Sequence, residues 1–270
     1  IGAMTRKVEN ENGETYEIKE LLEAYMTFGG MPSLTEVPLE LDKALTILDG
    51  IYSSVVIRDI LEREKQKGRR QVTDSSLLRK IIMFLADNIG NNTSINSISN
   101  ILLNEKLIET KPAVQTVQSY VTTLLEAYIF YEIKRFDIKG KEYLKTLGKY
   151  YIVDIGLRNY LLGFRNRDIG HIIENIVYFE LLRRGYDVAI GKIGENEIDF
   201  IATNINTKIY IQVTENMANS STREREIAPF YKIQDNFEKI VITNDESYLG
   251  IQDGIKIIRL VDFLLDENIL

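Results

Sequence analysis

Helical periodicity dominates the first half of the chain. Apolar side chains recur at intervals of three and four residues and predict helices over 16–27, 39–61, 77–89, from about Ser94, and 112–127. Pro112 suits the first residue of the last helix, because the amide hydrogen that proline lacks would be unpaired there. Short apolar runs over 129–136 and 142–144 predict a hairpin, and 150–153 is a further strand candidate. Three helices followed by a hairpin are typical of a winged helix-turn-helix.

The pattern changes in the last third of the chain, where strands outnumber helices. It predicts helices over 172–184, 223–237 and 261–265, and strands over 186–190, 197–202, 208–214, 239–243 and 255–259. Gly185 supports the end of the first helix, since glycine readily adopts the backbone conformation that closes helices. The order predicts a mixed sheet with helices packed on it.

Together these patterns predict an α+β, multidomain protein. We expect residues 1–4 to be an expression scar, 5–70 a helical segment, 71–155 a winged helix-turn-helix and 156–270 an α/β domain. The first residues run into a charged stretch without an obvious domain start. We therefore expect the chain to begin partway through a longer protein.

Composition excludes several classes of chemistry. The 270 residues include no cysteine, so a disulfide framework, a cysteine nucleophile and a thiolate metal site are excluded. The single histidine, His171, excludes a His-rich zinc site and argues against a Ser-His-Asp triad; we expect it to cap or pack beside the helix over 172–184. No G-x-x-x-x-G-K-[ST] sequence is present. No apolar run approaches the ~20 residues that cross a bilayer, so we expect a cytoplasmic protein without a membrane partner.

Positive charge gathers in one part of an acidic chain. The net charge is −7, yet residues 71–150 carry 10 basic and 8 acidic side chains. The basic excess comes from Lys134, Arg135, Lys139, Lys141, Lys145 and Lys149. Since phosphate contacts dominate the affinity of proteins for DNA, this window is where we expect a polyanion to bind.

The helix before the hairpin carries polar side chains suited to base contacts. Its outward positions include Gln115 and Gln118, which can hydrogen-bond base edges in a major groove. The hairpin lysines Lys139, Lys141 and Lys145 would then contact phosphate. The alternative is that the domain binds protein and that the lysines form a solvated edge, and the sequence leaves both interpretations open.

Two carboxylates in the last third are spaced for a joint role. Glu174 lies in a predicted helix and Asp199 in a predicted strand, and Gln212 and Thr214 lie in the next strand. If those strands pair, Asp199 and Gln212 reach the same region. The structural alternative is a solvated Glu174 and an Asp199 that pairs locally with Lys192 or Lys208. Tyr150 and Tyr151 are expected to be core aromatics.

This spacing resembles the PD-(D/E)XK restriction-endonuclease-like superfamily. In that family a helix Glu, a strand Asp and a strand Glu or Gln hold a divalent cation, and a lysine two residues further on activates water. Here Gln212 is neutral and Thr214 stands where the lysine is expected. The resemblance implies an endonuclease-like α/β domain with degenerate catalytic positions Glu174, Asp199, Gln212 and Thr214. It implies no cofactor in this chain, or Mg²⁺ at Glu174 and Asp199 if activity survives.

A wider resemblance covers the chain from about Glu20 onward. Its motifs are LLEAY at 21–25, GGMP at 29–32, RDI at 58–60, KYYIVDIGL at 149–157, ENIV at 174–177, EIDF at 197–200 and YIQV at 210–213. They are similar to the C-terminal region of unknown function of bacterial and archaeal AAA-type ATPases. The resemblance implies that residues 5–70 are an ATPase tail. It also implies that ATP and the Walker motifs belong to a missing N-terminal part.

Three functions follow as hypotheses. The leading one is a non-catalytic C-terminal module that binds DNA or a protein partner and is coupled to its own ATPase domain. The second is an active Mg²⁺-dependent nuclease, in which Glu174, Asp199 and Gln212 hold the metal and a lysine from elsewhere replaces Thr214. The third is a protein-interaction scaffold that is indifferent to DNA.

Overall fold

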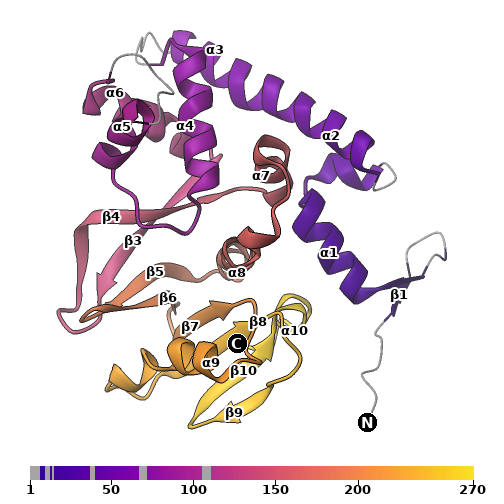
Figure 1. The fold of residues 1–270 in the computed structure, drawn as a ribbon, viewed down its shortest axis with the longest axis vertical. Coiled ribbons are helices and arrows are strands. Elements are labelled where there is room, and N and C mark those ends of the chain that lie inside the picture. Colours follow the sequence, from indigo (N-terminus) through magenta and orange to yellow (C-terminus); the bar gives the residue numbers. More distant parts are fainter. Residues whose placement is uncertain (1–6, 10–12, 14, 37–39, 67–71, 105–110) are drawn as a thin grey trace.

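The computed structural model describes residues 7–9, 13, 15–36, 40–66, 72–104 and 111–270. These residues form a mixed α+β protein, as predicted (Figure 1). The predicted expression scar at 1–4 and the predicted boundary at 70/71 lie outside the described residues. Among the described residues, no helix combines the length and the apolar character that crossing a bilayer requires.

The N-terminal part is mainly helical. A short antiparallel pair, β1 (Lys7–Glu9) and β2 (Thr15–Glu17), precedes α1 (Ile18–Phe28). The predicted helix over 39–61 is a succession of three segments with different hydrogen bonding: α2 (Leu41–Gly50), a π-helix (Ile51–Arg58) and α3 (Asp59–Gln66). The apolar spacing predicted the helical path, but not the widened turn.

Three further helices form the middle of the chain: α4 (Ser75–Asp87), α5 (Ile95–Asn104) and α6 (Val114–Glu126). Asp74 caps α4 by accepting the amides of Ser76 and Leu77. The prediction that Pro112 begins α6 is wrong, because Ala113 is the N-cap and the first helical residue is Val114. Most of the predicted apolar positions of these helices pack in one core, but Val114 at the start of α6 and Tyr128 after its end are exposed.

A mixed sheet of eight strands runs through the described part of the chain, in the order β4-β3-β5-β6-β7-β8-β10-β9. The strands are β3 (Phe130–Asp137), β4 (Glu142–Ile152), β5 (Asp187–Ile193), β6 (Asn196–Thr203), β7 (Lys208–Thr214), β8 (Glu238–Thr243), β9 (Gly250–Gln252) and β10 (Ile255–Arg259). The two predicted strands over 142–144 and 150–153 belong to the single strand β4. Since β3 pairs in parallel with β5, the sheet crosses the predicted boundary between residues 155 and 156.

Helices α8 (Ile169–Arg183), α9 (Ser220–Ile227) and α10 (Leu260–Leu265) pack against the sheet, whereas α7 (Ile155–Leu162) packs among the helices α1, α2, α4 and α8. The predicted helix over 223–237 is shorter, because Pro229 follows the end of α9 and a separate 3₁₀ turn, Phe230–Lys232, comes next. Helix α7 and strand β9 were not predicted. Helix α7 carries no amphipathic stripe, since Gly156, Arg158 and Asn159 are buried together with its apolar residues.

Two motifs of the AAA-type resemblance meet where α1 ends. The amide of Gly30 donates to Asp154 at 2.8 Å, and the Asn159 amide group donates to the carbonyls of Met26 and Thr27 at 2.9 Å each. A Cβ at Gly156 would lie 1.8 Å from the carbonyl oxygen of Phe28. The approach of the two backbones therefore requires glycine at that position.

Candidate functional site

Strand β4 supplies a lysine and a tyrosine to a buried charge cluster. Because successive side chains of a strand point to opposite faces, Lys149 and Tyr151 share one face, and that face meets α8. The Lys149 ammonium lies 2.9 Å from Glu174 Oε1, and the Tyr151 hydroxyl donates to the same oxygen at 2.5 Å. Asn175 fixes α8 against β4 by exchanging two 2.9 Å hydrogen bonds with the backbone of Ile152.

Glu174 is an internal residue of α8. Its side chain faces β4, and the residue is only 8% exposed, so the interpretation as a solvated helix residue is wrong. Its second oxygen, Oε2, lies 3.7 Å from Nδ1 of His171, one turn earlier on the same helix. His171 thus lies within the first turn of α8, and not beside the helix or at its cap as expected, and it contacts the candidate site.

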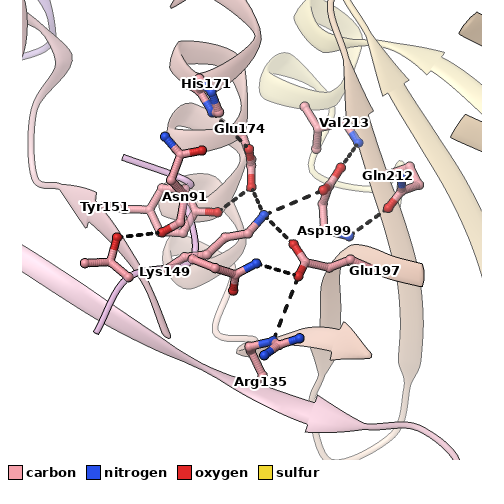
Figure 2. Close-up of polar contacts among 12 residues, drawn as sticks. Asn91, Arg135, Lys149, Tyr151, His171, Glu174, Glu197, Asp199, Gln212 and Val213 are labelled. Carbon is pink, nitrogen blue, oxygen red and sulfur yellow. Dashed lines mark hydrogen bonds and ion pairs between the residues drawn. The ribbon is translucent and has the colours of Figure 1, made fainter. Parts of the chain in front are cut away.

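Strand β6 supplies two carboxylates to the same ammonium. Glu197 and Asp199 are two residues apart and share one strand face. Lys149 Nζ lies 2.9 Å from Glu197 Oε1 and 3.9 Å from Asp199 Oδ1, and Figure 2 shows it between the side chains of α8 and β6. The structure therefore brings Glu174 and Asp199 to the same side of the sheet, around one lysine.

Gln212 and Thr214 lie in the neighbouring strand β7. The Gln212 side-chain oxygen accepts the backbone amide of Asp199 at 2.7 Å, and the amide of Val213 donates to Asp199 Oδ2 at 2.9 Å. The Gln212 amide nitrogen donates to Glu226 of α9 at 3.2 Å. The predicted proximity of Asp199 and Gln212 is confirmed, and Gln212 serves to hold β6 against β7.

The loop between α4 and α5 closes the cluster from the helical side. Asn92 donates to Glu197 Oε2 at 3.0 Å, and Thr93 exchanges two backbone hydrogen bonds with Gly148, directly before Lys149. Gly90 has φ +73° and lies so close to Glu174 that a Cβ would be 2.9 Å from Oε2. The loop backbone therefore packs directly on the carboxylate.

The surroundings shift the pKa values of Glu174 and Asp199 in opposite directions. Burial tends to raise the pKa of Glu174, but the charge of Lys149 and the donors around the carboxylate hold that pKa below its usual range. Burial raises the pKa of Asp199, and the charge of Glu174 adds to the shift. The three carboxylates overcome the desolvation of Lys149 and raise its pKa, so the ammonium stays charged at neutral pH.

The expected DNA-binding residues lie apart from this cluster. Lys139 and Lys141 are exposed at the turn between β3 and β4, and Gln115 and Gln118 are exposed on α6. The side chain of Lys145 lies outside the described residues. Two of the basic residues between Lys134 and Lys149 add little positive charge to the surface. Lys149 is 5% exposed, and the Arg135 guanidinium lies 3.9 Å from the Glu197 carboxylate. The surface charge excess is smaller than the sequence count indicates.

Sequence reasoning missed the lysine at the centre of the cluster. It named Lys192 and Lys208 as local partners of Asp199 and allowed an unidentified lysine from elsewhere under the nuclease hypothesis, whereas Lys208 pairs with Asp235 at 3.7 Å. Lys149 is separated from Glu174 and Asp199 by 25 and 50 positions, so local spacing carries no signal of the contact. Tyr151 is fully buried, as expected of a core aromatic, but its hydroxyl also binds Glu174.

Comparison with known proteins defines the family. Residues 19–168 match the family described as "Domain of unknown function (DUF8612)". The chain belongs to this family. The match covers α1 to α7 and includes Lys149 and Tyr151, whereas Glu174, Glu197 and Asp199 lie beyond it.

Two relatives of unknown function extend the similarity over nearly the whole chain. An uncharacterized protein of Haemophilus influenzae is 38% identical over 256 residues, which are 95% of this chain and 60% of the relative. "Uncharacterized protein MJ1544" of Methanocaldococcus jannaschii is 30% identical, over 93% of this chain and 56% of the relative. The chain thus spans less than two thirds of both relatives.

A solved structure shows a weak likeness. Protein VC1899 from Vibrio cholerae is aligned over 70% of this chain and 51% of its own, with 10% identity and a TM-score of 0.24. This similarity is too low to define a shared fold.

Proposed function

We propose that this chain is a non-catalytic, DNA- or partner-binding module of an AAA-type ATPase, with a degenerate nuclease fold. One observation carries the proposal. The carboxylates that would hold a catalytic cation already contact the Lys149 ammonium, while the β7 positions Gln212 and Thr214 carry no charge. The site is thus arranged for internal cohesion rather than for hydrolysis.

The arrangement of elements supports the two finer fold assignments within this proposal. Helices α4 to α6 followed by the β3–β4 hairpin match the order of a winged helix-turn-helix. Helix α8 followed by the antiparallel strands β5, β6 and β7, with β8 parallel to β7 after α9, matches the order expected for the endonuclease-like domain. Glu174 and Asp199 also meet, as that assignment requires.

The exposed side chains of the helix-and-hairpin part favour DNA as the ligand. Gln115 and Gln118 are exposed on α6, where they can reach base edges, and Lys139 and Lys141 are exposed at the hairpin turn, where they can contact a phosphate backbone. The two sets of side chains would divide the work of a DNA interface, since base contacts specify a sequence and phosphate contacts position the protein.

Two observations support coupling to an ATPase: the greater length of the relatives and the contact between Gly30 and Asp154. The relatives are longer than this chain, which leaves room for a further domain in them. The segment that resembles an ATPase tail is fixed to α7 through Gly30 and Asp154, and α7 packs against α8. We propose that the tail and the binding module move as one body.

A fluorescence anisotropy titration of a labelled DNA duplex across salt concentrations tests the DNA function. We expect affinity to fall as salt rises, with a slope of about −0.9 per phosphate contact. Lys139→Glu/Lys141→Glu should weaken binding, whereas Lys19→Glu, on an exposed residue of α1, is the matched control. Absence of binding, or binding without a salt slope, would remove DNA and leave a protein partner as the ligand.

A metal-dependent nuclease is the second candidate function. The observation that favours it is that a lysine does contact both predicted carboxylates, although it comes from β4 and not from position 214. This function predicts plasmid cleavage in Mg²⁺ or Mn²⁺ that disappears in Asp199→Ala. Intact plasmid after long incubation with either metal would exclude it.

A further inference from the structure

A lysine nitrogen occupies the centre of the carboxylate cluster, where a hard cation would otherwise lie. Lys149 Nζ contacts one oxygen of each surrounding carboxylate, at 2.9 Å from Glu174, 2.9 Å from Glu197 and 3.9 Å from Asp199. A divalent cation bound by those oxygens would need to approach them to about 2.0–2.6 Å. The ammonium and such a cation therefore compete for the same space.

The oxygens that face away from Lys149 already have donors nearby. Glu197 Oε2 accepts from Asn92 at 3.0 Å, and Asp199 Oδ2 accepts the Val213 amide at 2.9 Å. Glu174 Oε2 lies 3.7 Å from His171 Nδ1. Over the described residues, no group of three His, Asp or Glu side chains is placed to hold a metal ion. The residues present do not fit the cation that the endonuclease resemblance implies.

We infer that the Lys149 ammonium replaces that divalent cation and acts as a metal-free counter-ion joining β4, α8 and β6. The identity of the replaced cation rests on the proposed nuclease fold. The role of Lys149 as a counter-ion rests on its own contacts with the three carboxylates. Each element contributes one side of the cluster: β4 the lysine, α8 Glu174, and β6 Glu197 and Asp199. A single residue thus links the hairpin to the C-terminal sheet and its covering helix.

The inference makes opposite predictions for the protein with and without this lysine. With Lys149 present, Mg²⁺ and Mn²⁺ gain no site at the cluster. In Lys149→Met the apolar side chain leaves three converging carboxylates without their cation, and buried charges without a partner destabilise the folded state. The three carboxylates are not placed to hold a metal ion while Lys149 lies between them, but without the lysine they can close around a hard divalent cation. The cation then restores stability, because it binds the folded state preferentially.

Thermal unfolding with EDTA or with millimolar Mn²⁺ tests this directly. We expect the wild-type midpoint to be the same in both conditions. The midpoint of Lys149→Met should be lower in EDTA and should rise by about 5 °C with Mn²⁺. Adding Asp199→Asn to Lys149→Met should abolish most of that rise. Lys43→Met is the matched control, since it removes a lysine from an exposed ion pair with Glu40.

Two results would overturn the inference: a midpoint of the wild type that rises with Mn²⁺, or a folded Lys149→Met variant that does not respond. If Lys149→Met does not fold, electron paramagnetic resonance of Mn²⁺ with wild-type protein decides. No Mn²⁺ bound at the cluster supports the inference, and bound Mn²⁺ that is lost in Asp199→Asn contradicts it. The DNA titration depends on the hairpin and α6, so either proposal can fail while the other stands.

Discussion

The tip and the base of the β3–β4 hairpin use the same residue type in opposite ways. At the tip, Lys139 and Lys141 are exposed and free to meet a polyanion. At the base, Lys149 is 5% exposed and surrounded by three carboxylates. The comparison shows that a run of lysines in a sequence does not measure the charge of a surface. The turn before β4 carries two lysines toward solvent, and β4 itself carries Lys149 into the protein.

We expect the largest effect on the free energy of unfolding from removal of Lys149, the buried lysine at the base of the hairpin. Lys149→Ala leaves Glu174 and Glu197 without their cation, and breaking a buried ion pair from one side typically costs about 3–5 kcal/mol. The measurement is the free energy of unfolding from a urea titration. Lys141→Ala at the tip is the control and should change it by less than about 0.5 kcal/mol. Equal losses in the two variants would remove the distinction between tip and base.

A second prediction uses the pH dependence of stability. The raised pKa of Asp199 means that the folded state binds its proton more tightly than the unfolded state. Stability is therefore lost as pH rises from the ordinary carboxyl pKa of 3.8 toward the raised value. Asp199→Asn keeps an oxygen for the Val213 amide and cannot titrate. Urea midpoints at several pH values should show a flatter decline between the ordinary carboxyl pKa and the raised pKa of about 8 in this variant, and an unchanged profile would contradict the assignment.

Glu174 should act in the opposite direction. Its pKa is lowered in the folded state, so its contribution is present above the ordinary carboxyl pKa and is lost as pH falls through the lowered value. In Glu174→Gln, acid unfolding followed by circular dichroism should therefore show a weaker dependence on pH below about 4. Glu23→Gln on α1 is a suitable control. If Glu174→Gln unfolds in acid with the same pH dependence as the wild type, other carboxylates cause acid unfolding.

A smaller effect is expected from the hydroxyl that supports the cluster. Tyr151→Phe keeps the buried ring and removes the donor to Glu174, and a hydrogen bond to a charged group contributes about 1.5–3 kcal/mol. The free energy of unfolding should fall by that amount. Tyr143→Phe, on the exposed part of the hairpin, provides the comparison and should be near neutral. A neutral Tyr151→Phe would show that the hydroxyl does not stabilise the cluster.

The smallest effect on stability, and the clearest on binding, is expected at the tip. Lys139→Ala/Lys141→Ala should leave unfolding unchanged and lower the salt slope of DNA binding by about 1.8, for two lost phosphate contacts. The anisotropy titration across salt gives both affinity and slope. An unaltered slope would place the phosphate contacts on another surface.

The sequence predicted features that depend on neighbouring residues of the chain better than features that depend on contacts between distant ones. Helices α4 and α6 carry regular apolar stripes, and burial of a stripe is a local signal. Helix α7 was missed because its buried Arg158 and Asn159 find partners elsewhere in the chain, Arg158 with Ala86 and Asp168, and Asn159 with residues of α1. A pattern of apolar positions cannot anticipate polar side chains that are buried through distant partners.

The candidate site followed the same rule. Asp199 and Gln212 belong to neighbouring strands, so strand pairing predicted their contact. Lys149 reaches the cluster from a strand that is not adjacent to β6 in the sheet, and no spacing rule connects them. The sequence did carry a signal for the third carboxylate of the cluster. Glu197 lies two residues before Asp199, and strand alternation turns both side chains to the same side.

The close backbone approach of Gly156 to Phe28 has a consequence for dissecting this protein into fragments. A chain cut after the first helices would leave α7 with the carboxylate of Asp154 and the amide of Asn159 exposed where α1 had paired with them. Such a fragment would lose the hydrogen bonds that join α7 to the end of α1. Boundaries chosen for expression or for limited proteolysis should therefore keep the N-terminal helices and the C-terminal sheet on one polypeptide.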